Sequence, residues 1–155
     1  MDGDDLLPPD TVQHINGIIE KYPDINYIIG RCLYFDNKSF YIKSHKGLTD
    51  SRLAYTLPFN GQSPIKCDLF DKVGGYNKAF YHGGADWDFW LSVVELKTRG
   101  KQIKDIIYER RIRENNVGGK WVNNRYEIVK TIIERHPKYY SNTDIIENCL
   151  AKSYE

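Results

Sequence analysis

Apolar residues recur along the chain at two spacings, one typical of helices and the other of strands. Helical spacing, or a short apolar run closed by glycine, predicts helices over residues 10–21, 68–73, 85–98, 121–135 and 143–152. Runs rich in tyrosine, isoleucine and phenylalanine predict strands over residues 26–35, 40–42 and 102–108, and a short polar turn joins the first two as a hairpin. Helices that alternate with strands favour an α/β fold, a mixed sheet flanked by helices.

The helix expected over residues 85–98 carries the strongest pattern. Its one apolar side holds Trp87, Trp90, Leu91 and Val94. Residues 44–63, by contrast, mix polar residues and glycine with few periodic apolar positions. A connection of this length is typical of a binding loop, and we expect it to be mobile. A second loop, rich in charge, is expected over residues 109–119.

The composition indicates that the chain forms a single globular domain. The chain has 155 residues, of which 41% are apolar and 28% charged, enough to form a core of ordinary size. The formal net charge of +1 creates no field that would favour nucleic acid as a partner. The three cysteines are odd in number and include no C-x-x-C pair, which indicates neither a disulfide framework nor a zinc site.

The sequence gives no sign of a membrane span or a leader. No apolar stretch approaches the roughly 20 residues that a span requires, and Met1 is followed by acids instead of a basic region. We therefore expect a cytoplasmic protein. Peripheral association with the inner face of a membrane stays open, because soluble domains often act at a bilayer that they do not enter.

Three carboxylates, those of Asp2, Asp4 and Asp5, surround Gly3 near the start of the chain. Carboxylate oxygens, completed by water and phosphate, are the usual ligands of Mg²⁺ or Mn²⁺ in chemistry on nucleotides. An acidic chain start is also typical of a solvated terminus or a helix-capping cluster. Both interpretations stay open at this point.

Asp86 and Asp88 follow two glycines at a predicted helix start. Positions two apart on a helix point about 200° away from each other, so one carboxylate can face a cleft while the other caps or pairs. In the simpler interpretation both acids complement the positive end of the helix, and the neighbouring tryptophans are core. His82, beside the glycines, is the one histidine that merits a test.

A basic segment, Arg110-Arg111-Ile112-Arg113, follows a predicted strand. Such cations can bind a diphosphate leaving group, although solvated surface charge is the alternative. Basic and aromatic residues do not interleave in a continuous stripe suited to single-stranded nucleic acid.

Three blocks of sequence occur in an informative order. They are Met1-Asp-Gly-Asp-Asp-Leu-Leu-Pro-Pro-Asp10, Cys67-Asp-Leu-Phe-Asp-Lys-Val-Gly-Gly-Tyr-Asn-Lys-Ala-Phe80 and Gly84-Ala-Asp-Trp-Asp-Phe-Trp-Leu91. Together they resemble a family 2 glycosyltransferase with the GT-A fold, over residues 1 to about 117. Residues 118–155 would then be a helical extension packed on that domain. Ala85 departs from the family, which usually has glutamate there, and Arg113 stands where a histidine is common.

The resemblance implies roles for the candidate residues. Asp4 would bind Mn²⁺ or Mg²⁺ directly, with Asp2 nearer the nucleotide ribose, and Asp5 and Arg113 would support the nucleotide side. Asp86 would be the catalytic base. The acceptor would contact His82, Trp87 and Asp88.

The implied reaction is metal-assisted transfer of a sugar, with inversion, from a nucleotide-sugar donor to a hydroxyl of a saccharide or lipid-linked saccharide. In the family a nucleotide-binding half precedes the acidic cluster. We therefore expect the chain to be the C-terminal half of a GT-A domain, weak or inactive alone, completed by a separate N-terminal half or a homodimer partner. Two rivals stay open: a metal-dependent phosphoryl hydrolase, and a non-catalytic carbohydrate-binding domain with an acceptor groove around residues 44–66 and 76–90.

Overall fold

The computed structural model describes residues 3–36, 40–43, 50–112, 118–141 and 143–151. In chain order the elements are α1 (Thr11–Lys21), β1 (Tyr27–Phe35), β2 (Phe40–Lys43), α2 (Asp50–Leu53), α3 (Cys67–Val73), the 3₁₀ helix η1 (Lys78–Phe80), α4 (Ala85–Glu95), β3 (Gly100–Arg111), α5 (Gly118–Arg135) and α6 (Thr143–Ala151). Every helix and strand that the pattern predicts is present, with ends shifted by a few residues. The structure adds α2 and η1.

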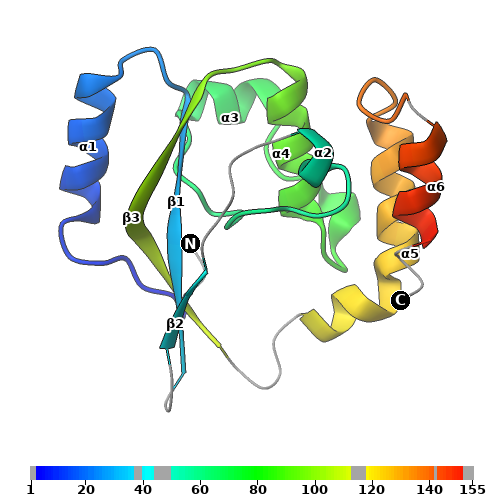
Figure 1. Cartoon of the computed structure of the whole chain (residues 1–155), viewed down its shortest axis with the longest axis horizontal. Coiled ribbons are helices and arrows are strands. Elements are labelled where there is room, and N and C mark those ends of the chain that lie inside the picture. Colours follow the sequence, from blue (N-terminus) through cyan, green and yellow to red (C-terminus); the bar gives the residue numbers. More distant parts are fainter. Residues whose placement is uncertain (1–2, 37–39, 44–49, 113–117, 142, 152–155) are drawn as a thin grey trace.

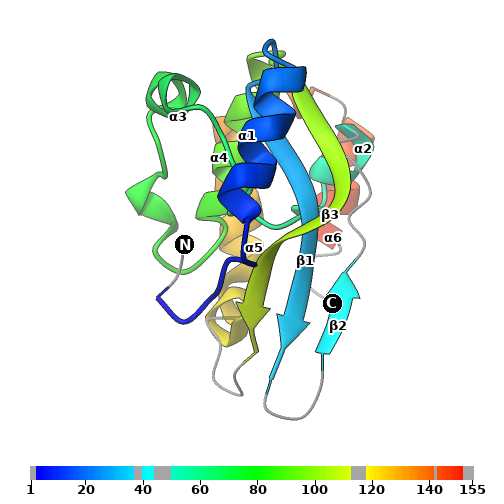
Figure 2. The same ribbon diagram turned by 90° about the vertical axis from the view of Figure 1, so that its left-hand side faces the viewer.

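A three-stranded sheet in the order β2-β1-β3 forms the centre of the fold. β1 pairs antiparallel with β2 and parallel with β3, so the predicted hairpin is confirmed and the fold is mixed α/β. A parallel pair needs a long crossover connection, and here α2, α3, η1 and α4 lie in that connection. Figure 2 shows the strands side by side, with β2 at one edge and β3 at the other.

Helices cover both faces of the sheet. On one face, Ile18 of α1 packs with Ile28 of β1 and Ile107 of β3. Tyr27 and Ile29 point to the other face, because side chains alternate along a strand, and they cluster there with residues of α3 and α4. In Figure 1, α1 lies to the left of the sheet, and α4, α5 and α6 lie to its right.

α4 is buried on two sides, so the expectation of a single apolar side is wrong. Phe89 and Trp90 belong to the cluster that covers the sheet. Trp87 and Leu91 belong to a second cluster, formed with α5, α6 and the end of α2. A helix between two cores buries most of its circumference, and its sequence is then apolar nearly all round.

Part of the stretch expected as a mobile loop belongs to the core. Leu53 at the end of α2 is 0% exposed, and Phe59 is 4% exposed. The described part of the stretch, residues 50–63, is therefore not a solvated connection, and residues 44–49 lie outside the described residues. The loop expected from residue 109 also begins later, because β3 continues to Arg111.

The outermost layer consists of α5 and α6. Their side chains complete the second cluster with Ile128, Val129, Ile132 and Cys149. Across the described ranges, no helix is both long enough and apolar enough to cross a membrane.

Candidate functional site

A pocket of about 350 Å³ opens beside the N-terminus of α4. It is lined by Asn60, Gly61, Gln62, Tyr76, Gly83, Gly84, Ala85, Asp86 and Arg110. Except for Arg110, which comes from β3, these residues fall within the two stretches where the carbohydrate-binding alternative places an acceptor groove. We call this cavity the Asp86 pocket.

Two buried indoles hold one wall of the Asp86 pocket in place. Trp87 Nε1 donates to the carbonyl oxygen of Leu53 at 2.6 Å, and Trp90 Nε1 donates to that of Gly61 at 2.9 Å. Both bonds fasten the segment before the pocket to α4. Gly61 is needed there because a Cβ at its position would lie 2.6 Å from Oδ2 of Asp86.

Asp86 lies in the first turn of α4 and is exposed where it lines the pocket. Its Oδ1 accepts a hydrogen bond from the backbone N–H of Trp87 at 2.9 Å. Gly83 and Gly84 precede the helix with φ angles of 123° and 85°, which residues with a side chain rarely adopt. The two glycines thus allow the turn that brings this carboxylate to the cavity.

Arg110 brings a positive charge to the pocket from the end of β3. Burial alone would lower the pKa of Arg110, but the Tyr34 hydroxyl and the Asp5 carboxylate outweigh that effect and raise the pKa. The guanidinium is therefore charged at any ordinary pH and suits an anionic group such as phosphate. The next residue, Arg111, lies instead over the ring of Phe35 at 4.6 Å.

A chain of hydrogen bonds connects the N-terminal acids to the pocket. Asp5 is buried, and its Oδ2 accepts from the Tyr108 hydroxyl at 2.6 Å. The Tyr108 oxygen also lies 2.5 Å from the side-chain amide of Gln62, a pocket residue. The Tyr108 hydroxyl is placed to donate to Oδ2 of Asp5 or to Oε1 of Gln62, and because a phenol has one hydrogen it makes one of these bonds at a time.

Backbone pairing fixes the same segment to β3. The N–H and carbonyl of Leu6 each bond to the backbone of Glu109 at 2.9 Å. The residues just before Leu6 therefore lie against the end of β3, the strand end that also carries Arg110.

The described acids fit the implied Mn²⁺ or Mg²⁺ only in part. Both carboxylate oxygens of Asp5 accept hydrogen bonds, from the Tyr108 hydroxyl and from the backbone N–H of Arg111, so Asp5 is held in a structural role. Asp4 is half-buried, and Asp2 lies outside the described residues. Within the part of the chain that the structure describes, no group of three or more His, Cys, Asp or Glu side chains could hold a metal ion. A cation site would therefore depend on Asp4, Asp2 and oxygens of the donor phosphates.

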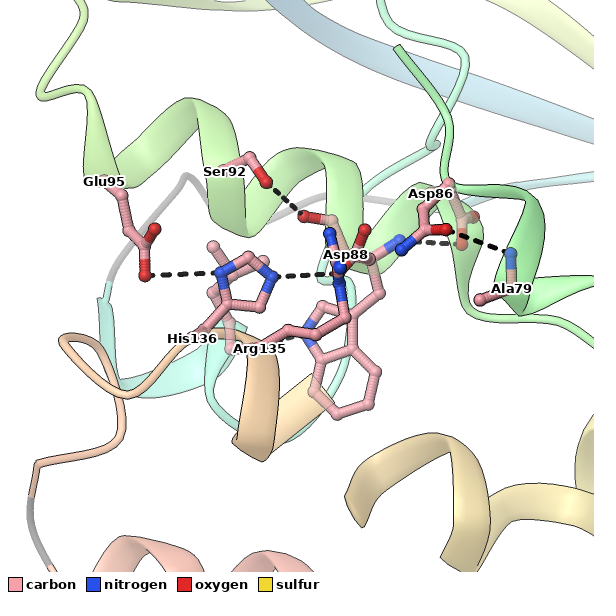
Figure 3. Close-up of polar contacts among 10 residues, drawn as sticks. Ala79, Asp86, Asp88, Ser92, Glu95, Arg135 and His136 are labelled. Atoms are coloured by element: carbon pink, nitrogen blue, oxygen red, sulfur yellow. Dashed lines mark hydrogen bonds and ion pairs between the residues drawn. The ribbon is translucent and has the colours of Figure 1, made fainter. Parts of the chain in front are cut away.

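Asp88 is buried and faces the end of α5 in a polar network with Arg135, His136 and Glu95 (Figure 3). Its Oδ1 lies 2.8 Å from Nε of Arg135 and 3.0 Å from Nε2 of His136, whose Nδ1 lies 3.2 Å from Oε1 of Glu95. Burial alone would raise the pKa of Asp88, but the hydrogen bonds from His136 and Arg135 outweigh it and lower the pKa below its usual range. Asp88 thus ties α5 to α4 and does not line the pocket, a correction to the acceptor contact that the resemblance implies.

The other acceptor candidates also lie apart from the cavity. Trp87 is 2% exposed, so its ring offers no surface on which a sugar could stack. Trp90 is core, with 0% exposure. The half-buried ring of His82 lies 3.8 Å from that of Tyr81, centroid to centroid, and borders the pocket glycines without lining the pocket. Arg113 lies outside the described residues.

Asn60 and Tyr76 also line the pocket, although Asn60 belongs to no motif and Tyr76 has no role assigned within the block of residues 67–80. Asn60 is 8% exposed, and its Nδ2 is buried with no hydrogen-bond partner among the described residues. An unpaired buried donor costs about 1–3 kcal/mol. The sequence could indicate only the regions in which these residues lie, which are the polar stretch that ends at residue 63 and the stretch that follows the glycines at 74 and 75.

No family model and no curated protein matches the chain. What the chain does is therefore inferred from the three sequence blocks and from the Asp86 pocket. The contribution of each residue that lines the pocket can be tested by substitution.

Proposed function

We propose that the chain is a glycosyltransferase of the GT-A type in which Asp86 acts as the general base. The observation that carries the proposal is the exposed carboxylate of Asp86 in a pocket of about 350 Å³ that it shares with the Arg110 guanidinium. A base and a cation at one cavity suit a displacement in which a hydroxyl loses its proton while an anionic group departs. The mixed sheet flanked by helices is compatible with a GT-A domain.

In the proposed step, Asp86 takes the proton of an acceptor hydroxyl, and the oxygen forms a bond to the anomeric carbon of the donor sugar. The bond from that carbon to the diphosphate oxygen breaks, so the configuration inverts and a nucleoside diphosphate leaves. Arg110 stabilises the negative charge of the leaving group. A Mn²⁺ or Mg²⁺ ion, when bound through Asp4 and Asp2, supplies further positive charge for the phosphates.

Sugar transfer from a panel of nucleotide sugars to methyl glycosides tests this function. With Mn²⁺ and the full chain at a concentration similar to the donor, mass spectrometry is expected to detect the acceptor plus one sugar residue. Asp86→Asn is expected to lower the rate about a hundredfold or more, because a positioned base contributes about 10²–10⁴-fold. Removal of the metal with EDTA is expected to lower it as well.

Asp71→Asn is the matched control, since Asp71 is an exposed acid on α3 outside the pocket. Undiminished product from the Asp86→Asn variant contradicts the proposal. Release of phosphate without sugar transfer favours the phosphoryl hydrolase, and saccharide binding without product under any condition favours the non-catalytic binding domain.

A further inference from the structure

Asn60, a lining residue of the Asp86 pocket, carries a buried hydrogen-bond donor that has no partner among the described residues. Asn60 is more than nine-tenths buried, at 8% exposure, and lines the pocket. Its Oδ1 accepts from the backbone N–H of Gln62 at 3.2 Å, and this bond fixes which end of the amide carries the NH₂ group. Nδ2 makes no hydrogen bond within the residues described. An orphaned donor of this kind at a pocket points to an acceptor atom supplied by a ligand.

Tyr76 gives the same pocket an apolar surface. The side chain is 47% exposed, and its ring packs against Phe89 at 4.9 Å and Phe70 at 5.7 Å between centroids. A ring held by two other rings has little freedom left to lose when a ligand stacks on its exposed part. Tyr76 therefore has the properties of a rigid stacking platform.

Charge and size further limit the ligand. The lining contains one acid, Asp86, and one base, Arg110, so the pocket as a whole carries no net charge and does not require a charged ligand. A cavity of about 350 Å³ lies near the lower end of the range of about 300–1,000 Å³ found for small-molecule sites. One ring fits these limits better than an extended chain, and a pyranose combines hydroxyls at its edge with an apolar C–H face.

We propose that the Asp86 pocket binds one pyranose ring of the acceptor, and that Asn60 and Tyr76 are its specificity-determining residues. Nδ2 of Asn60 donates to a hydroxyl oxygen of the ring that does not react. Tyr76 packs on the apolar face, and Asp86 receives the reacting hydroxyl. The inference rests on the proposed function only in that the hydroxyl at Asp86 is the one that reacts. Binding of the ring can be measured without any sugar transfer.

An NMR titration of the ¹⁵N-labelled full chain tests the donor. The probes are methyl α-mannopyranoside and the methyl β-pyranosides of glucose, galactose and N-acetylglucosamine. At least one probe is expected to shift the side-chain NH₂ signal of Asn60 together with the backbone signals of Gly83 and Gly84. Asn60→Asp keeps an oxygen towards Gln62 and loses the donor, so the Kd is expected to rise about tenfold. Asn16→Asp, at an exposed position of α1, is the control and leaves the Kd unchanged.

A second set of variants tests the platform. Tyr76→Ala is expected to weaken binding of the same glycoside about tenfold, whereas Tyr76→Phe keeps the ring and binds within about twofold of the wild type. Phe40→Ala on β2 is the control for loss of an exposed aromatic side chain, since Phe40 is 76% exposed and outside the pocket. Deoxy analogues of the bound glycoside identify the hydroxyl, because removing the one that Asn60 contacts weakens binding to the wild type and not to Asn60→Asp.

The outcomes separate this inference from the proposed function. Equal Kd values for the wild type and Asn60→Asp overturn the inference, whatever the transfer assay gives. The inference is also overturned if none of the probes shifts the Asn60 NH₂ signal. This measurement uses the wild type alone, so it does not depend on whether a variant folds. Binding that depends on Asn60 and Tyr76 without a product that depends on Asp86 supports the inference and contradicts the transferase function.

Discussion

Asp86 and Asp88 show how two acids two residues apart acquire different roles. The helical angle between them predicts that one faces a cleft while the other pairs, and the structure confirms this division. Which acid does which could not be predicted, because Arg135 and His136 lie far along the chain, at the end of α5 and just after it. Asn60 could not be found from sequence either, since its distinguishing feature is an amide group buried without a described partner.

Substitution of Asp88 is expected to weaken the fold and to change its acid sensitivity. Asp88→Asn weakens the contacts that the buried Oδ1 makes with His136 and with the half-exposed Arg135, so it is expected to lower the free energy of unfolding at pH 7 by about 1–3 kcal/mol. The pKa of Asp88 is lowered in the folded state. Its contribution is therefore complete above the unfolded pKa of about 3.9 and is lost as the pH falls below that value through the folded pKa.

Urea unfolding between about pH 2 and 7 measures this contribution. The wild type is expected to lose more stability below about pH 4 than Asp88→Asn does. Asp71→Asn, exposed on α3, serves as the control for a surface carboxylate. Identical losses in the wild type and Asp88→Asn would show that Asp88 carries no such contribution.

At the scale of elements, local sequence patterns were sufficient to predict where each expected helix and strand lies along the chain. They were not sufficient to predict which other elements pack against it. α1 has one buried face, as its spacing of Ile15 and Ile18 indicates. α4 has two, because the sheet lies on one side and α5 and α6 on the other. The second contact depends on residues that follow by more than 30 positions, so the pattern of α4 alone could not reveal it.

Two glycines in different elements should respond oppositely to alanine. Gly100 of β3 pairs with Tyr27, and a Cβ there would lie 1.9 Å from the Tyr27 ring. Gly100→Ala is therefore expected to lower the free energy of unfolding by about 1–3 kcal/mol through overpacking. Gly17, inside α1, has nothing within 4 Å of its Cβ position. Gly17→Ala is expected to raise stability by about 0.5–1 kcal/mol.

Urea denaturation of the two alanine variants checks both signs. A stable Gly100→Ala variant would mean that the Tyr27 ring can leave the sheet surface at little cost. A Gly17→Ala variant no more stable than the wild type would mean that α1 gains nothing from a better helix former.

At the scale of the whole molecule, two hydrophobic clusters share α4, one against the sheet and one against α5 and α6. Cys32 lies in the sheet at 0% exposure, and Cys149 lies in the cluster of α5 and α6 at 4%. Cys67 is exposed. Cys67 therefore reports on the surface, Cys32 on the sheet and Cys149 on the cluster of α5 and α6.

Alkylation by iodoacetamide at pH 8 is expected to modify Cys67 rapidly and the other two cysteines only on unfolding. Burial raises the pKa of Cys32 to about 11, so its reactive thiolate is scarce as well as inaccessible. If the cores unfold together, Cys32 and Cys149 become labelled at the same rate, as followed by peptide mass spectrometry. Faster labelling of Cys149 would show that α6 opens independently of the sheet.

The sharing of α4 also bears on how the protein can be shortened. A version that ends before α5 would leave Trp87 and Leu91 facing water, because both pack against that helix and α6. It would also leave the buried carboxylate of Asp88 without Arg135 and His136, the two side chains that its Oδ1 contacts. A gene shortened to end before α5 is therefore a poor choice, and a minimal version intended for crystallisation should retain α5.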